Sequence, residues 1–402
     1  MPNSFPNNKD LMINISTLFD PRYVFLIYIP ILFAINKQVG HRMMIALTLA
    51  EWMNQILKWL LAGERPYWYV HERAQELAVA RNLSLSSSSS SFDGNLPFGD
   101  ELNEEPGARL VELKQFPVTC ELGAGSPSGH SMVTATVWYI LIDALFKGEL
   151  RLFAAAATKS GQGNEWLNRL ATLSWTVYGL MLVSVGLSRV YLACHFPHQC
   201  LCGALLGAII ARTVIEHLPM ERLNKSHFCL GTLAMFSSAL GTYALLRSLG
   251  MDPLWSVHKA MRWCAKKEYI HLDTTPFFSM MRYLGVCLGA GLAYDGSKII
   301  AASGSNEKKT QEIGDRYATK LNEQQTLVVL VRRALAALLA IGFGQFLLAL
   351  PVPKSNLNVF YAISLVIYTA FAFVSAKTAP ALAKRLMPTT TTANNIQRLK
   401  SQ

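Results

Sequence analysis

The stretch Pro127–Phe146 reads PSGHSMVTATVWYILIDALF, a short turn followed by a long apolar run. The run after His130 is long enough to cross a bilayer as a helix, which needs about 20 residues. Proline and glycine just before a helix make a tight turn whose backbone N–H groups point outward at the helix N-terminus and can bind a phosphate oxygen. The sequence therefore predicts a membrane helix with an anion site at one end.

The composition extends this prediction to the whole chain. Only 16% of its residues are charged, 51% are hydrophobic and the mean hydropathy is +0.25, whereas soluble proteins are about one quarter charged. We predict an all-α fold, a polytopic membrane bundle of about nine helices, with eight as the alternative because the first apolar run is short. The expected spans are 22–39, 41–61, 130–147, 170–188, 197–216, 227–249, 277–297, 326–350 and 357–378.

The net charge of +11 does not indicate a nucleic-acid partner, because the basic residues are spread over the loops between the apolar runs. Cytosolic loops of membrane proteins carry an excess of Lys and Arg. By this rule the residues near 37–42, 147–169, 212–226 and 298–325 are cytosolic, together with the tail 381–402. The N-terminus 1–21 and Pro127–His130 then face the lumen.

Between the first and last spans lies one membrane domain, 22–380. It contains a serine-rich and then acidic segment, 67–117, which is too polar to fold alone and is expected to be a flexible luminal insert. Asn82 in this insert starts a glycosylation motif, Asn-Leu-Ser. Of the seven cysteines, Cys120 and Cys264 are both expected on the luminal side, where they could pair or stay free.

Two further clusters flank other spans: Lys58 with Arg65, and Arg189 with His195. A single cation at a helix end can simply reach for lipid headgroups. Here, however, three segments on one membrane face each offer a cation or an imidazole. We therefore predict that they converge on one anion, with arginine as a planar fork and lysine as a point charge.

The three motifs Lys-x6-Arg-Pro (58–66), Pro-Ser-Gly-His (127–130) and Ser-Arg-x5-His (188–195) resemble those of the type 2 phosphatidic acid phosphatase superfamily. Within it, the chain resembles the glucose-6-phosphatases through the stretches 115–121, 195–199 and 271–277. Lipid phosphatases of the superfamily usually have an aspartate four residues after the last histidine of these motifs. This chain has Gln199 there, as the glucose-6-phosphatases do.

The resemblance implies that His195 is the nucleophile, which forms a phosphohistidine, and that His130 is the proton donor. It implies that the phosphate is held by Lys58, Arg65, Ser128, Gly129 and Arg189, that Gln199 orients the nucleophile, and that His198, Asp273 and Thr274 are candidates for a sugar pocket. No metal or other cofactor is implied. Glu51 and Asn54, inside the second span, are expected to face the bundle interior, where they either bind substrate or hold helices together.

The resemblance further implies hydrolysis of glucose 6-phosphate to glucose and phosphate, the last step of gluconeogenesis and glycogenolysis. The protein would lie in the endoplasmic reticulum membrane, with a luminal active site and a glucose-6-phosphate transporter as a partner. Two alternatives stay open. One is a lipid phosphate phosphatase that uses the same residues, and the other is a non-catalytic transporter or scaffold that retains an anion site.

Overall fold

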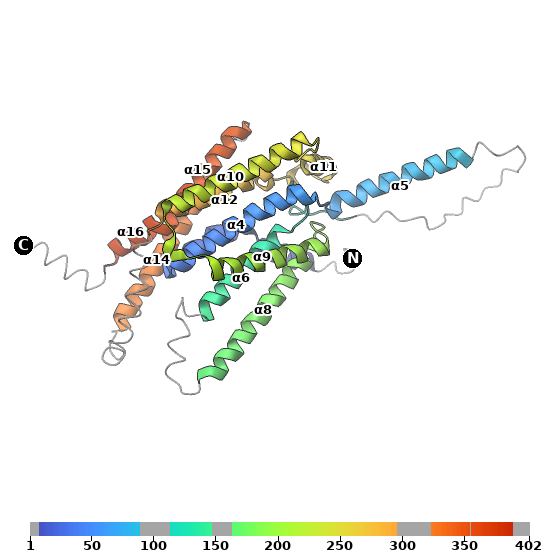
Figure 1. Cartoon of the computed structure of the whole chain (residues 1–402). Coiled ribbons are helices and arrows are strands. Elements are labelled where there is room, and N and C mark those ends of the chain that lie inside the picture. The colour runs from blue at the N-terminus through green and yellow to red at the C-terminus, as the bar shows by residue number, and fades with distance from the viewer. Residues whose placement is uncertain (1–7, 89–112, 147–162, 296–322, 354, 389–402) are drawn as a thin grey trace, which may run out of the picture.

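The computed structural model describes residues 8–88, 113–146, 163–295, 323–353 and 355–388, and within these ranges its regular elements are all helical. The long helices run alongside one another as a bundle, and one helix, α5, projects well beyond it (Figure 1). The long helices of the bundle are α4 (Lys37–Leu61), α6 (Gly129–Phe146), α8 (Gly163–Tyr191), α9 (Pro197–His217), α10 (Lys225–Ser248), α12 (Pro276–Ala293), α14 (Glu323–Ala349) and α15 (Leu357–Phe373). The predicted all-α membrane bundle is confirmed.

Eight helical segments of the described chain are long and apolar enough to cross a membrane. Eight of the nine expected spans correspond to them, and the ninth, 41–61, corresponds to α4. This helix packs against α6, α9 and α12 inside the bundle but falls outside the eight, because it carries polar residues such as Glu51, Asn54 and Lys58. Those polar residues supply part of the site described below.

The N-terminal segment differs from expectation, since the sequence predicts no helix before residue 22. The structure has α1 (Lys9–Leu18), then α2 (Pro21–Tyr23), a π-helical turn Val24–Tyr28 and α3 (Ile29–Ile35). Helix α1 packs on α8, where the Ser188 hydroxyl donates to the Met12 carbonyl at 2.7 Å. Asp20 caps α2 by accepting from the backbone N–H of Arg22 at 2.8 Å. The N-terminus thereby covers the end of α8 that carries Arg189.

The expected flexible insert begins instead as a helix, α5 (Pro66–Ser88). Pro66 suits a first helical position because its missing N–H would be unpaired there. The fully buried side chains of Tyr67 and Trp68 anchor the base of α5 to the loop before α6 and to α11 (Trp255–Trp263). Asn82 lies on α5, but its side chain is outside the described residues, as are residues 89–112. Most of the expected loop 298–325 and the tail beyond residue 388 are likewise not described.

Close packing of α9 on α6 fixes the turn that precedes α6. A Cβ atom at Gly203 would collide with the Ser128 carbonyl, and one at Gly207 with the Met132 carbonyl. Helices can approach this closely only where glycine leaves the space. The backbone N–H of Ser128 also donates to the Gln199 carbonyl at 3.0 Å. The Pro127–His130 turn and the start of α9 are thus held together.

A disulfide joins Cys120 to Cys264 across 144 residues, with their Cα atoms 5.9 Å apart. Of the two alternatives that the sequence left open, pairing is therefore the one observed. The bond ties the loop that contains Glu121 to the segment after α11. It thereby restrains the backbone of a loop that carries part of the site.

Candidate active site

The three clusters converge on one carboxylate, that of Glu121. Arg65, just before α5, donates from Nη2 to Glu121 Oε2 at 2.9 Å, and Arg189 of α8 donates from Nη2 to Oε1. Two imidazoles lie close to the same group: His130 Nδ1 is 3.8 Å from Oε1, and His195 Nε2 is 4.0 Å from Oε2. Both arginines and both histidines of the predicted site therefore surround a single anion.

Arg65 is held rigidly in a fully buried position. Its Nε donates to the Gly123 carbonyl at 2.7 Å, Nη1 to the Cys194 carbonyl at 3.0 Å and Nη2 to the Ala124 carbonyl at 3.1 Å. These bonds, with the one to Glu121, use most of the five N–H donors of a guanidinium. Arg65 is therefore a preorganised cation that need not reorient when an anion binds.

The hydrogen bonds of His195 indicate which ring nitrogen is free. Nδ1 lies 2.7 Å from the Gly125 carbonyl and 3.3 Å from Gln199 Oε1, both of which are acceptors. Nδ1 is accordingly assigned the proton, and Nε2, 3.3 Å from Arg65 Nη1, keeps its lone pair. Burial and the charge of Arg65 hold the pKa of His195 well below its usual 6.5. The imidazole is thus neutral, as a nucleophile must be.

Gln199 lies where the sequence predicts, in the first turn of α9 beside His195. Its Nε2 donates to the Glu64 carbonyl at 2.7 Å, and its Oε1 also accepts from the backbone N–H of Phe196 at 3.1 Å. The amide is therefore fixed at both ends. The shorter contact to His195 Nδ1, however, comes from the Gly125 carbonyl, so the tautomer is set by two acceptors rather than by Gln199 alone.

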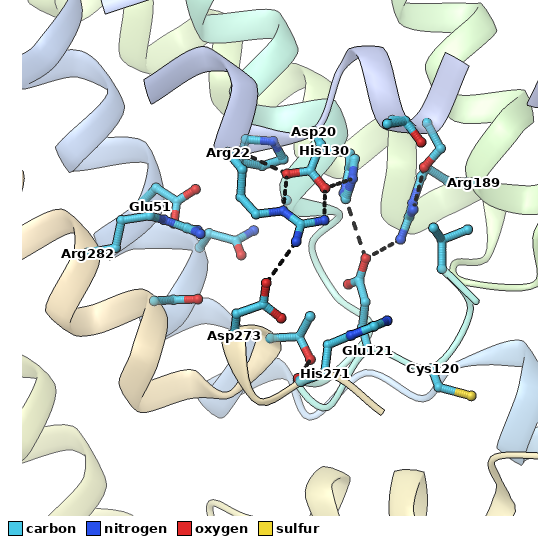
Figure 2. Close-up of a pocket in the computed structure, with 18 of the residues that line it drawn as sticks. Asp20, Arg22, Glu51, Cys120, Glu121, His130, Arg189, His271, Asp273 and Arg282 are labelled. Carbon is cyan, nitrogen blue, oxygen red and sulfur yellow. Dashed lines mark hydrogen bonds and ion pairs between the residues drawn. The ribbon is translucent and has the colours of Figure 1, made fainter. Parts of the chain in front are cut away.

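A polar cavity of about 150 Å³ opens on this centre (Figure 2). One end is lined by Glu121, His130 and Arg189, and the other by Arg22, Glu51, Asp273 and Arg282 (Figure 2). Lys58, Gly129 and Thr274 line the cavity as well. At the second end two ion pairs face the cavity, one between Arg22 and Asp273 at 2.8 Å and one between Arg282 and Glu51 at 2.7 Å. The cavity can therefore hold a ligand that is anionic at one end and rich in hydrogen-bonding groups at the other.

Two of the expected residues are placed differently from the others. The Ser128 hydroxyl is fully buried and lies 3.3 Å from the Ser131 hydroxyl, so it does not line the cavity. His198 is exposed and stacks on Phe196, because Gln199 and His195 take the inward face of this turn. The structure does not bring His198 to the cavity, whereas Asp273 and Thr274 do line it.

Sequence reasoning missed several residues that the structure brings to the site. Glu121 lies at the centre, Asp20 Oδ2 is 3.8 Å from His130 Nε2, and the Ser16 hydroxyl accepts from Arg189 Nη1 at 2.7 Å. The available signal for Glu121 was its place at the end of the stretch 115–121. Asp20 and Ser16 gave no signal, because they lie in the segment before the first expected span.

Among the described residues, no three His, Cys, Asp or Glu side chains come together as a group that could hold a metal ion. The cavity is lined by the cations Lys58 and Arg189, and Arg65 is buried behind Glu121.

Comparison with known proteins identifies the family of the chain. Residues 41–222, which include all three motifs, match the PAP2 superfamily. The chain is 37% identical over 297 residues to glucose-6-phosphatase catalytic subunit 1 of Rattus norvegicus, covering 73% of this chain and 72% of the relative. It is 33% identical over 353 residues to glucose-6-phosphatase 2 of Homo sapiens, covering 87% and 83%. No solved structure matches the chain. The protein is therefore a multi-pass membrane phosphatase that belongs to the glucose-6-phosphatase family within the PAP2 superfamily.

Proposed function

We propose that the protein hydrolyses glucose 6-phosphate to glucose and inorganic phosphate through a phosphohistidine intermediate. The observation that carries this proposal is the convergence of Arg65, Arg189, His130 and His195 at one end of a polar cavity. The names of the similar proteins support glucose 6-phosphate as the substrate, and the polar far end of the cavity suits a sugar.

In the first step, His195 Nε2 attacks phosphorus in line with the leaving sugar oxygen. The P–N bond forms as the P–O ester bond breaks, and His130 donates its proton to the departing oxygen. The charges of Lys58, Arg65 and Arg189 balance the negative charge on the three equatorial oxygens. The bond from His195 Nδ1 to the Gly125 carbonyl stabilises the positive charge that develops on the ring.

In the second step, water attacks the phosphohistidine. His130, now neutral, accepts a proton from this water as the P–N bond breaks, and inorganic phosphate leaves. In the observed structure Asp20 Oδ2 lies 3.8 Å from His130 Nε2, and Glu121 Oε1 lies 3.8 Å from His130 Nδ1. Asp20 therefore orients the ring through both steps in our proposal.

The far end of the cavity offers unused hydrogen-bonding groups. Asp273 Oδ1 and Arg282 Nε are both buried and have no hydrogen-bond partner among the described residues. Leaving such groups unpaired costs about 1–3 kcal/mol each, so hydroxyl groups of a bound sugar that pair with them would add affinity. Together with Thr274, these groups form the sugar pocket in our proposal.

A second candidate substrate, a lipid phosphate, has its own supporting observation. A larger cavity of about 650 Å³ lies beyond the Arg22–Asp273 ion pair and is lined mainly by apolar residues such as Phe278, Leu347 and Ile367. An acyl chain could occupy it if this ion pair opened. In the observed structure the pair is closed at 2.8 Å, and we therefore rank the sugar phosphate first.

The cellular setting is also part of the proposal. The Cys120–Cys264 disulfide suits an oxidising compartment, and the distribution of Lys and Arg favours a cytosolic location for the opposite face. We place the site on the luminal side of the endoplasmic reticulum membrane, with Asn82 as a glycosylation site on the same side. Substrate would then arrive through a glucose-6-phosphate transporter, and the reaction would end gluconeogenesis and glycogenolysis.

The purified protein in detergent tests these alternatives. We expect phosphate release from glucose 6-phosphate, its loss in His195→Ala, and its retention in His198→Ala, the matched control with an exposed imidazole three residues away. If the protein released phosphate from phosphatidic acid but not from glucose 6-phosphate, its substrate would be a lipid phosphate. A folded protein that binds phosphate but releases none from either substrate would be the transporter or scaffold.

A further inference from the structure

The Glu121 carboxylate occupies the position that the substrate phosphoryl group needs. Its two oxygens accept hydrogen bonds from Arg65 and Arg189, the same two guanidinium groups that are expected to hold the phosphate. They also lie 3.8 Å and 4.0 Å from the imidazoles of the expected proton donor and nucleophile. A tetrahedral phosphoryl group that contacts both arginines and both histidines would overlap this carboxylate.

Glu121 also separates the nucleophile from the cavity. Its carboxylate lines the cavity, whereas His195 and Arg65 are fully buried on its other side. In-line attack requires the phosphorus to approach His195 Nε2 to about 3–3.5 Å. With Glu121 Oε2 at 4.0 Å from that nitrogen, the space is already filled. The observed arrangement is therefore an anion-occupied site rather than one ready for substrate.

The occupying group is charged. Burial opposes ionisation of Glu121, but the charges of Arg189 and Arg65 outweigh it and hold the pKa of Glu121 well below its usual 4.5. The three positive charges of Lys58, Arg65 and Arg189 match the two negative charges of a phosphate monoester plus the one of Glu121. The proton that His130 carries in the proposed first step is balanced by the Asp20 carboxylate beside its Nε2. The site can thus hold phosphate and keep a displaced carboxylate nearby without surplus charge.

We infer that Glu121 is an internal anion that exchanges with phosphate in every catalytic cycle. Substrate phosphate displaces its carboxylate from the two arginines and so gains access to His195. After the phosphohistidine is hydrolysed, the carboxylate returns to the arginines and expels inorganic phosphate. This inference rests on the proposed function, because it assumes that the arginine pair binds a phosphoryl group.

The surroundings allow the side chain to move while the backbone stays in place. The Tyr67 hydroxyl donates to the Glu121 carbonyl at 3.1 Å, and the preceding residue, Cys120, is fixed by its disulfide. The side chain retains 17% exposure, and the cavity that it lines gives it room to rotate. Exchange therefore needs a rotamer change and no movement of a helix.

The test is Glu121→Gln, which keeps the size of the side chain and removes its charge. The probes are inorganic phosphate and orthovanadate, and their Kd is measured by titration of the purified full-length protein in detergent. We expect both anions to bind on the order of tenfold more tightly, because a like charge about 4 Å away no longer competes. Turnover should fall as phosphate release slows, with stronger product inhibition.

Glu72→Gln is the matched control. It removes the same charge from a carboxylate near the site, one that pairs with Lys259 at 2.7 Å and does not line the cavity. We expect its phosphate Kd to change less than about twofold, because the group lies outside the anion site. If Glu72→Gln tightened phosphate binding as much as Glu121→Gln, the effect would come from net charge alone, and the inference would be wrong.

Phosphate binding to Glu121→Gln that is unchanged or weaker would show that Glu121 only positions the arginines. If this variant does not fold, Glu121→Asp takes its place, since the shorter carboxylate holds the two arginines less well. We expect tighter phosphate binding there too, and weaker binding would overturn the exchange. Because these titrations use no sugar, a protein that binds phosphate but does not hydrolyse glucose 6-phosphate would contradict only the proposed function.

Discussion

Replacing Arg65 by lysine should abolish activity and destabilise the protein, although the charge is kept. The guanidinium donates to the carbonyls of Gly123, Cys194 and Ala124 and to Glu121, and it lies 3.3 Å from His195 Nε2. A lysine ammonium has three donors on one atom and cannot reach all of these acceptors. At least two buried acceptors would lose their partner.

Each buried acceptor left unpaired costs about 1–3 kcal/mol, so we expect a loss of about 2–6 kcal/mol in the free energy of unfolding. Even a 3 kcal/mol loss of transition-state stabilisation would lower kcat/KM more than about 100-fold. Thermal unfolding in detergent and phosphate release from glucose 6-phosphate measure the two effects. Arg73→Lys, on the exposed face of α5, is the control and should change neither. An Arg65→Lys variant with near wild-type stability and turnover would refute the rigid-fork account of this residue.

Three further predictions follow from the burial, packing and cavity contacts. The pKa of His195 is held well below 6.5, so below about pH 6.5 the unfolded chain binds a proton at this residue that the folded chain does not. The free energy of unfolding should therefore fall as the pH drops. In melting experiments at several pH values, His195→Asn should show a weaker dependence on pH. Gly203→Ala should lower the melting temperature sharply, because the new Cβ atom would collide with the Ser128 carbonyl. Gly241→Ala is the control and should leave the melting temperature unchanged, because Gly241 has open space around it. Equal melting temperatures of the two variants would refute the tight α6–α9 contact. Asp273→Asn should raise the KM for glucose 6-phosphate about tenfold, since one sugar hydrogen bond is worth about 1.5 kcal/mol. The Ki of phosphate should stay unchanged. If both constants rose in parallel, Asp273 would not belong to the sugar pocket.

Much of the bundle could be predicted from the sequence, because lipid-facing spans need long apolar runs whatever their neighbours are. The convergence of the three clusters was also predictable, since each cluster lies at the end of a span on the same side of the membrane. Helix α5 was not predictable in this way. Its polar composition indicates a flexible segment, and the contacts that anchor its base, made by Tyr67 and Trp68, come from distant parts of the chain.

The residues that were missed depend on contacts between segments far apart in the sequence. Glu51 was expected to face the bundle interior, but its partner Arg282 was missed, because the two residues are 231 positions apart and share no local pattern. Asp20 reaches His130 only because the N-terminal segment folds back over α8 and α6. Glu121 belongs to the stretch 115–121, which the sequence analysis used. It was not chosen as a site residue because a phosphate site is expected to be lined by positive charges, not by a carboxylate.

In the proposed mechanism, His195 carries the phosphoryl group during turnover. A direct test mixes the purified protein with glucose 6-phosphate that is radiolabelled in its phosphate group and quenches the reaction rapidly. Digestion and peptide mapping then locate the label. We expect an acid-labile, alkali-stable label on the peptide that contains His195, formed as fast as turnover requires and absent from His195→Ala. Turnover at the normal rate with no label on His195, or with the label on another residue, would contradict it.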